Sequence, residues 1–226
     1  MTVPVLTIDG PSGSGKGTVS RRVAARLGWH LLDSGALYRL VALAGRQGGM
    51  DPADEAGHAR LAAALQVRFG EAAGGGEQVL LGPDWRDVVA EIRSEEAGQG
   101  ASRVAVWPSV RAALLQRQKD FAQSPGLVAD GRDMGTVVFP SAALKIYLTA
   151  SAEERARRRY NQLKDKGSGA NLAALSLEIA ERDRRDSTRA VAPLVPAADA
   201  IVVDSTSLGI DEVVDHIMAA AQVRGL

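Results

Sequence analysis

The apolar residues of this chain fall into short runs, separated by longer stretches in which apolar residues recur at helical spacing. Five of the short runs contain little polar alternation, which is typical of strands buried in a parallel sheet: 3–8, 29–33, 126–131, 144–150 and 200–205. Between the first two runs, Val19, Val23 and Leu27 follow one another at intervals of one helical turn. Strands that alternate with helices predict an α/β fold, in which helices cover both faces of a mostly parallel sheet.

Capping residues, prolines and glycines predict where the helices begin and end. Ser151 and Glu154 form a capping-box pair ahead of an arginine-rich helix, and Gly28 is placed to end the first helix. Asp51 followed by Pro52 predicts a helix that ends near residue 65. The other predicted starts are Ser34, Ser94 (helix about 95–106), Pro108, Asn171 (helix to about 189) and Ile210.

Residues 67–89 have a different pattern. The runs "VRF", "QVLL" and "DVV" are short, and "GEAAGGGE" separates the first two. Short extended runs around a glycine-rich turn predict a small antiparallel sheet. We expect this sheet to be inserted into a chain that otherwise alternates strand and helix.

Composition narrows the classes of partner and site. The chain has 226 residues with 27 basic and 27 acidic side chains, so net charge offers no general attraction to nucleic acid or anionic membrane. Cysteine is absent and the three histidines are scattered, which argues against a disulfide framework and a thiolate or histidine metal site. No apolar run approaches the ~20 residues of a membrane span, and the first residues lack an export signal. We therefore expect a cytoplasmic protein with no nucleic-acid or membrane partner.

The stretch "GPSGSGKGT" lies between the first predicted strand and the first predicted helix. Glycines let backbone N–H groups point inward at a phosphate, and the start of the following helix adds the positive end of its dipole. Strand, G-x-x-x-x-G-K and helix together predict a phosphate-binding loop for ATP, whereas a plain glycine turn explains the lysine less well. The predicted ATP-binding residues are Gly10, Pro11, Ser12, Gly13, Ser14, Gly15, Lys16, Gly17 and Thr18.

The loop departs from the general motif at the residue after the lysine. Gly17 occupies the position where a hydroxyl usually ligates magnesium, and the hydroxyl comes one residue later, at Thr18. The form "GKGT" resembles the nucleoside monophosphate kinases of the adenylate kinase type, in which Mg²⁺ rests largely on water and nucleotide. We predict no direct protein ligand for Mg²⁺. Asp130, at the end of a predicted strand, is placed to hold a magnesium-bound water, and the alternative is that it caps a turn.

Arginines suited to a second phosphate site are grouped along the chain. Arg155, Arg158 and Arg159 share one face of a predicted helix, whereas Arg157 points elsewhere. Each arginine-rich group has an alternative explanation as a solvated, ion-paired helix face. The other candidates are Arg39, Arg111, Arg132 with Asp133, and Arg182, Asp186 and Arg189 at i, i+4 and i+7.

Nearly the whole chain resembles the bacterial cytidylate kinases, through "IDGPSGSGKGT", "WHLLDSGALYR", "ADGRDMGTVVFP", "ERDRRDSTRAVAPLVPAADA" and "VVDST". The resemblance implies one kinase domain with a P-loop core (1–35, 108–154 and 172–226), a monophosphate-binding lobe (about 36–107) and a short helical lid (about 155–171). It implies ATP and CMP or dCMP as substrates, Mg²⁺ as cofactor, and a monomer. It places CMP at Ser34, Arg39, Ser102, Arg111, Arg132, Asp133, Arg182, Asp186 and Arg189, and the catalytic charges at Lys16, Arg132, Arg155, Arg158, Arg159 and Arg189.

The chemistry of these residues agrees with that substrate. Within the family, Ser102, Arg111 and Asp133 face the base, Arg182 and Asp186 reach the sugar, and Arg39, Arg132 and Arg189 hold the phosphate. A carboxylate accepts a hydrogen bond from the N4 amine of cytosine, where uracil presents an oxygen. The acceptor phosphate is already largely ionised at neutral pH, with a second pKa of about 6, so no general base is needed.

Three alternatives remain. A kinase of another monophosphate, or of a small metabolite such as shikimate, would share the same core. A GTP-dependent switch would need Asn-Lys-x-Asp, but the two asparagines, Asn161 and Asn171, are followed by Gln162 and Leu172. A nucleic-acid-binding ATPase is disfavoured because the chain lacks a basic stripe with interleaved aromatics.

Overall fold

The computed structural model describes residues 3–165, 167, 169 and 171–226. The chain divides into two compact units. The core unit holds the residues up to Asp33 and from Gln118 onward, and the inserted unit comprises Ser34–Arg117. The predicted lid, about 155–171, falls within the core unit and includes residues 166, 168 and 170, which lie outside the described residues.

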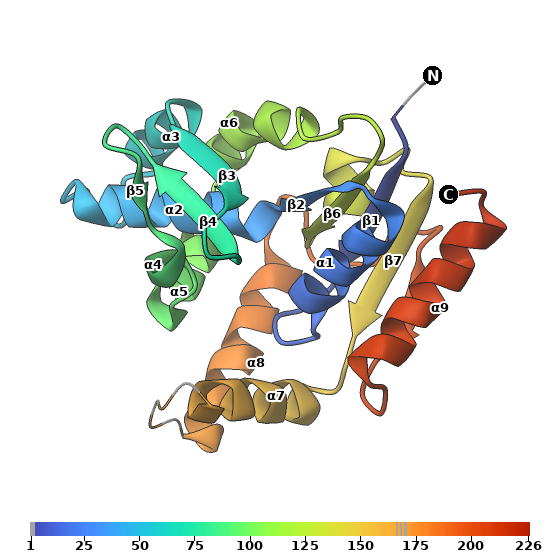
Figure 1. The fold of residues 1–226 in the computed structure, drawn as a ribbon. Coiled ribbons are helices and arrows are strands. Elements are labelled where there is room, and N and C mark those ends of the chain that lie inside the picture. Colours follow the sequence, from blue (N-terminus) through green and yellow to red (C-terminus); the bar gives the residue numbers. More distant parts are fainter. Residues whose placement is uncertain (1–2, 166, 168, 170) are drawn as a thin grey trace. The chain divides into compact units, whose positions relative to one another are not determined.

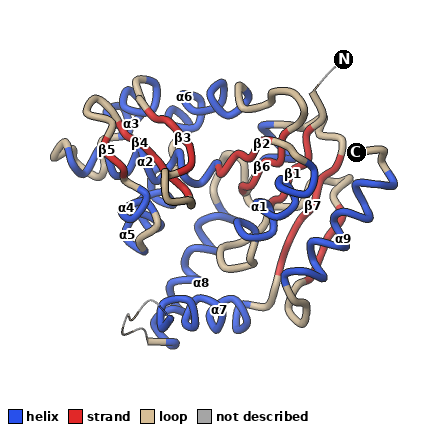
Figure 2. Tube along the Cα trace, in the orientation of Figure 1, coloured by secondary structure: helices blue, strands red, loops and turns tan. Residues whose placement is uncertain are grey.

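The core unit is built on a parallel five-stranded sheet with the order β2-β6-β1-β7-β8, as the alternating pattern predicts (Figures 1 and 2). Every residue of β1 and of β6 is buried, which explains why these runs show no polar alternation. The strands are β1 (Val5–Asp9), β2 (His30–Asp33), β6 (Leu127–Gly131), β7 (Leu144–Thr149) and β8 (Ile201–Asp204).

The two faces of this sheet are covered differently. On one face, Leu6 and Ile8 of β1 pack in a single apolar cluster with residues of α1 (Lys16–Leu27) and α9 (Ile210–Val223). On the other face, Gly135 packs directly against the side chains of Thr7 and Lys145. Gly135 belongs to a π-helical turn, η1 (Met134–Val138), which the sequence pattern does not predict.

The core-unit helices begin and end close to the predicted residues. Gly28 ends α1 in the left-handed conformation, and Asn171 caps α8 (Leu172–Thr188) through a hydrogen bond from the Ala174 N–H. The predicted capping box ahead of α7 (Ala152–Asp165) is only half formed. Ser151 Oγ accepts from the Glu154 N–H, but the Ser151 N–H donates to Thr206 because the Glu154 carboxylate binds arginines instead.

The inserted unit contains the predicted antiparallel sheet, which has three strands in the order β3-β4-β5 (Figure 2). Apolar side chains of α2 and α5 supply much of its buried interior. Its elements are α2 (Ser34–Gln47), α3 (Glu55–Ala63), β3 (Val67–Glu71), β4 (Glu77–Leu81), β5 (Arg86–Asp87), α4 (Val89–Ile92), α5 (Glu95–Val104) and all but the last two residues of α6 (Pro108–Lys119).

Two predictions about this unit are wrong in detail. Asp51 and Pro52 do not start a helix: the Asp51 carboxylate accepts from the Ala53 N–H in a turn, and Asp54 caps α3. Val89, predicted as extended, begins the short helix α4 because the Asp87 carboxylate binds its N–H. Over the described part of the chain, no helix combines the length and the apolar character that crossing a bilayer requires.

Candidate active site

The glycine loop lies between β1 and α1, and close packing against β7 fixes its first residue. A Cβ on Gly10 would lie 2.0 Å from the carbonyl oxygen of Leu148, so the chain can pass this point only as glycine. Lys16 begins α1, and its Nζ donates to the carbonyl oxygen of Pro11 at 2.8 Å. The lysine therefore folds back over the loop that precedes it.

The Lys16 ammonium is buried among charges of both signs. Burial lowers its pKa from 10.5 to about 7; Arg132 and Arg182 act in the same direction, whereas Asp130 and Asp9 oppose it. A buried cation beside two guanidinium groups is a strong site for an added anion. Phosphate bound here would relieve the repulsion that lowers this pKa.

Asp130 is the penultimate residue of β6 and pairs with Asp33 of β2, and its carboxylate faces the start of α1. Its Oδ2 lies 3.6 Å from the position that a Cβ on Gly17 would occupy. Among the residues that the structure describes, no three His, Cys, Asp or Glu side chains gather into a metal cage. The Asp130 carboxylate next to the loop suits a magnesium ion that keeps its waters and is carried mainly by phosphates.

Asp9 is a site residue that the sequence interpretation missed. It ends β1 directly before the loop, and its two oxygens each accept a backbone hydrogen bond at 2.8 Å, from Met134 and from Gly135. Burial raises the pKa of Asp9 to about 7, against the two hydrogen bonds, which lower it. This carboxyl ties the loop to the segment that follows Arg132 and Asp133. The only signal in the sequence is a carboxylate at the end of an otherwise apolar strand.

Two pairs of opposite charge join α8 and the residue just after it to the segment after β6. Arg132 Nε donates to Asp186 at 2.9 Å, and Arg189 lies 3.7 Å from Asp133. Burial disfavours the charged forms of both Arg132 and Asp186. The Asp186 carboxylate nevertheless raises the pKa of Arg132. In turn, Arg132 and Arg182 lower the pKa of Asp186. The core unit thus brings together five of the predicted acceptor-site residues: Arg132, Asp133, Arg182, Asp186 and Arg189.

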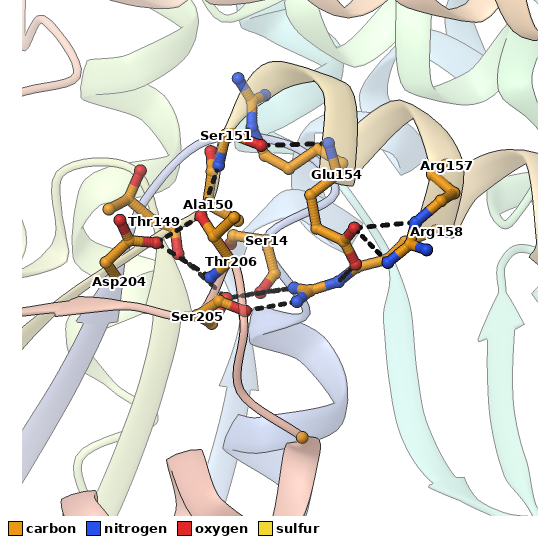
Figure 3. A network of polar contacts seen from close by, with 12 residues as sticks. Ser14, Thr149, Ala150, Ser151, Glu154, Arg157, Arg158, Asp204, Ser205 and Thr206 are labelled. Atoms are coloured by element: carbon orange, nitrogen blue, oxygen red, sulfur yellow. Dashed lines mark hydrogen bonds and ion pairs between the residues drawn. The ribbon is translucent and has the colours of Figure 1, made fainter.

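The predicted lid arginines differ in their contacts. Arg158 reaches the carbonyl oxygens of Ser14 (3.4 Å) and Ser205 and the hydroxyl of Ser205 (3.1 Å), while Glu154 holds its Nε at 2.8 Å (Figure 3). Arg157 is exposed and binds only Glu154 among these residues, as its position on the helix predicts. Arg159 donates to Gln162 at 2.5 Å, and burial lowers its pKa against the pull of Glu178.

Arg155 is buried deeper than the other lid arginines. Its guanidinium binds the carbonyl oxygens of Ala150 and Ser12, each at 3.0 Å, and both carboxylate oxygens of Asp183. Arg158 thus reaches the glycine loop at Ser14, and Arg155 reaches it at Ser12. Asp183 and Ser205, which complete these contacts, were not singled out from the sequence because each lies in a charged or polar run.

The inserted unit holds the remaining predicted acceptor residues, Ser34, Arg39, Ser102 and Arg111. Arg39 donates to the carbonyl oxygens of Ile92 (2.6 Å) and Ser94 (3.3 Å). Arg111 is buried, with its guanidinium 5.9 Å from the centre of the Tyr38 ring. Ser102 is also buried, and within the described residues its hydroxyl has no hydrogen-bond partner. A buried hydroxyl without a partner is expected where a ligand supplies it.

Comparisons with known proteins agree with these motifs. A sequence model of the family described as Cytidylate kinase matches residues 6–223. A cytidylate kinase of Stutzerimonas stutzeri (strain A1501) is 60% identical over 224 residues, which cover 99% of this chain and 97% of the relative. The cytidylate kinase of Shewanella loihica (strain ATCC BAA-1088 / PV-4) is 59% identical over 212 residues, covering 94% and 91%.

Similarity to solved structures is weaker. A shikimate kinase from Acinetobacter baumannii in complex with shikimate is 15% identical with a TM-score of 0.49, covering 100% of this chain and 96% of that chain. Likeness at this level does not bear on the family. The match of the family model along almost the whole chain, and the two relatives of nearly equal length, confirm the resemblance drawn from the motifs: this chain belongs to the cytidylate kinase family.

Proposed function

We propose that this protein transfers the γ-phosphoryl group of ATP to CMP or dCMP and releases ADP with CDP or dCDP. The observation that carries the proposal is the family match over residues 6–223. The buried lysine in a glycine loop, next to paired guanidinium groups, supports it independently. The enzyme would act in pyrimidine nucleotide metabolism.

Lys16 and the amides of the loop bind the β- and γ-phosphates of ATP in this proposal. Mg²⁺, when bound, would neutralise negative charge on these phosphates during transfer. Asp130 would hold it through a water, because its carboxylate faces the start of α1. Thr18 is exposed in the first turn of α1.

The acceptor nucleotide is bound mainly by arginine and acidic side chains in this proposal. Arg39, Arg132 and Arg189 bind its phosphate, and Arg182 and Asp186 bind its ribose. Ser34, Ser102, Arg111 and Asp133 complete the site, the last three at the base. Because Arg132 already donates a hydrogen bond to Asp186, its guanidinium is oriented before the nucleotide arrives, and Asp133 places an opposite charge 3.7 Å from Arg189.

Transfer itself requires positioning and charge neutralisation and no general base, because the acceptor phosphate is already ionised. Arg158 and Arg159 supply positive charge to the phosphoryl group in flight, and closure of the lid excludes water as a competing acceptor. Arg132 and Arg189 act on the acceptor side of the same group. Arg155 instead binds the carbonyl oxygen of Ser12 and the carboxylate of Asp183.

A coupled ADP-release assay tests the proposal with CMP, dCMP, UMP, AMP and shikimate side by side. We expect CMP and dCMP to be preferred over UMP by roughly five- to a hundred-fold, because a buried mismatched polar group costs about 1–3 kcal/mol. A preference for UMP, AMP or shikimate would refute the proposed substrate.

A further inference from the structure

Arg155 is saturated by contacts within the protein. Its Nε donates to Ala150 O at 3.0 Å, and Nη1 donates to Ser12 O at 3.0 Å. Nη1 and Nη2 also donate to the two oxygens of Asp183, at 3.1 Å and 2.6 Å. A planar guanidinium bound on three sides by fixed acceptors has one orientation. This side chain is therefore held in place before any nucleotide binds.

Asp183 supplies the negative charge in this arrangement. The side chain of Arg155 is only 6% exposed, and that of Asp183 is 27% exposed. A buried guanidinium without a counter-ion is strongly unfavourable, whereas a bidentate carboxylate both balances the charge and fixes the plane. Asp183 lies on α8 between two residues with proposed roles at the ribose, Arg182 and Asp186, but its own carboxylate is directed to α7.

The contact with Ser12 bears directly on phosphate binding. A peptide unit is planar and trans, so its carbonyl and the next N–H point in opposite directions. Arg155 holds the Ser12 carbonyl toward α7, which directs the Gly13 N–H away from that helix. Gly13 itself has φ +78°, and a Cβ there would lie 3.0 Å from the Arg155 Cβ. The loop and the first turns of α7 are packed as closely as glycine allows.

A second arginine of the same helix repeats this contact. Arg158 donates to the carbonyl oxygen of Ser14 at 3.4 Å, while Ser205 and Glu154 hold its guanidinium (Figure 3). Alternate carbonyls of the loop, at residues 12 and 14, thus face α7. The N–H groups of the residues that follow them are left to face the opposite side.

We propose that Asp183 is a positioning residue for ATP. It balances the charge of Arg155 and fixes the plane of its guanidinium; Arg155 fixes the Ser12 carbonyl, and the Gly13 N–H is thereby presented to the nucleotide phosphates. The inference rests on the ATP site of the proposed function and adds a residue to it. Arg155 in this arrangement acts on the loop, not on the transferred group. Preorganising the loop lowers the entropy lost when ATP binds.

Asp183→Asn tests this, with Glu181→Gln as the matched control. Glu181 is also an acidic residue of α8, but it is 60% exposed and lies 3.9 Å from Arg185 of its own helix. ATP affinity is measured directly by titration calorimetry without acceptor, and KM is measured for ATP and for CMP. We expect Asp183→Asn to weaken ATP binding about ten-fold, the effect of losing a charged hydrogen bond. The KM of Asp183→Asn for CMP should stay within about two-fold of the wild type, and so should the affinities of Glu181→Gln.

Two further variants separate positioning from a general loss of structure. Arg155→Lys keeps the positive charge but loses the planar set of donors that binds both oxygens of Asp183, so it should weaken ATP binding similarly. The double variant with Asp183→Asn should bind ATP no more weakly than either single variant. Asp183→Glu keeps the carboxylate and should recover part of the ATP affinity. Circular dichroism melting of each variant identifies any that fails to fold.

The outcomes are distinct. If Asp183→Asn raises the KM for CMP and leaves ATP affinity unchanged, Asp183 serves the acceptor side and the inference is wrong. If Asp183→Glu folds but binds ATP no better than Asp183→Asn, the charge has no positioning role. Because ATP binding is measured without acceptor, a wild type that fails to phosphorylate CMP would refute the proposed function alone.

Discussion

The carboxyl of Asp9 is subject to two opposing effects, and the stability of the protein should report which is larger. Burial favours the protonated form, whereas hydrogen bonds from the Met134 and Gly135 N–H groups favour the charged form. The net result raises the pKa of Asp9 from 3.8 to about 7. The folded protein therefore binds this proton more tightly than the unfolded chain does.

The sign of the pH dependence follows from linkage. Between the two pKa values the folded state holds more protons than the unfolded state, so the stability contributed by Asp9 falls as pH rises and levels off above 7. A shift of about three pKa units corresponds to about 4 kcal/mol in all. Roughly half of that, about 2 kcal/mol, is lost between about pH 5.5 and pH 8.5, where acid unfolding does not interfere.

Asp9→Asn removes the titration and keeps the size of the side chain. At low pH it should match the wild type, since an amide and a protonated carboxyl each offer one acceptor oxygen. At about pH 8.5 it should be more stable than the wild type by about 4 kcal/mol in all, and about 2 kcal/mol of this difference should develop between about pH 5.5 and pH 8.5. Urea unfolding followed by circular dichroism, with both proteins at each pH, measures the difference while other titrating groups cancel.

The opposite pH dependence is expected if the hydrogen bonds to Asp9 are the larger effect. If the two backbone hydrogen bonds outweigh burial, the folded pKa lies below the unfolded one, and the wild type gains stability over Asp9→Asn as pH rises. If the free energy of unfolding of the wild type minus that of Asp9→Asn rises with pH or stays constant, burial is not the larger effect at Asp9.

Two further changes give separable results. Lys16→Ala should lower turnover by about 100- to 1,000-fold through loss of charge at the phosphates, while the variant remains folded because burial disfavours the ammonium that it removes; near-normal turnover by a folded variant would refute this role. Ser102→Ala should change the free energy of unfolding by less than about 1 kcal/mol, since its buried hydroxyl has no partner within the described residues. The same variant should raise the KM for CMP and leave that for ATP unchanged in steady-state assays; a variant that binds CMP normally would exclude Ser102 from the site.

The parts of this molecule that the sequence predicts best are those with strong local signals. Buried strands contain runs without polar residues, as in β1 and β6, and the caps at Gly28, Ser94 and Asn171 are where the residue types predict them. Short elements were missed because a few residues carry no period: α4 spans Val89–Ile92 and η1 spans Met134–Val138.

The residues of the candidate site likewise divide into those with a local sequence signal and those without one. The glycine loop is a local motif and is evident from spacing, whereas the partners of its arginines come from distant segments. Asp183 is 28 residues from Arg155, and Asp9 is 125 residues from Met134. A carboxylate in a charged run such as "RDRRDSTR" looks the same whether it faces solvent or a buried guanidinium. Only the packing of α7 with α8 distinguishes the two cases.

The pairing of β6 with β1 limits where this chain can change length. Ile8 lies opposite Asp130 and Asp9 opposite Gly131, so the register sets how far Asp130, Arg132 and Asp133 stand from the glycine loop. One extra residue within β6 would displace them by about 3.3 Å and turn each onto the other side of the sheet. Extra residues in the exposed connection before Leu127 would leave that register intact, so homologues can differ in length there without losing alignment at the phosphates.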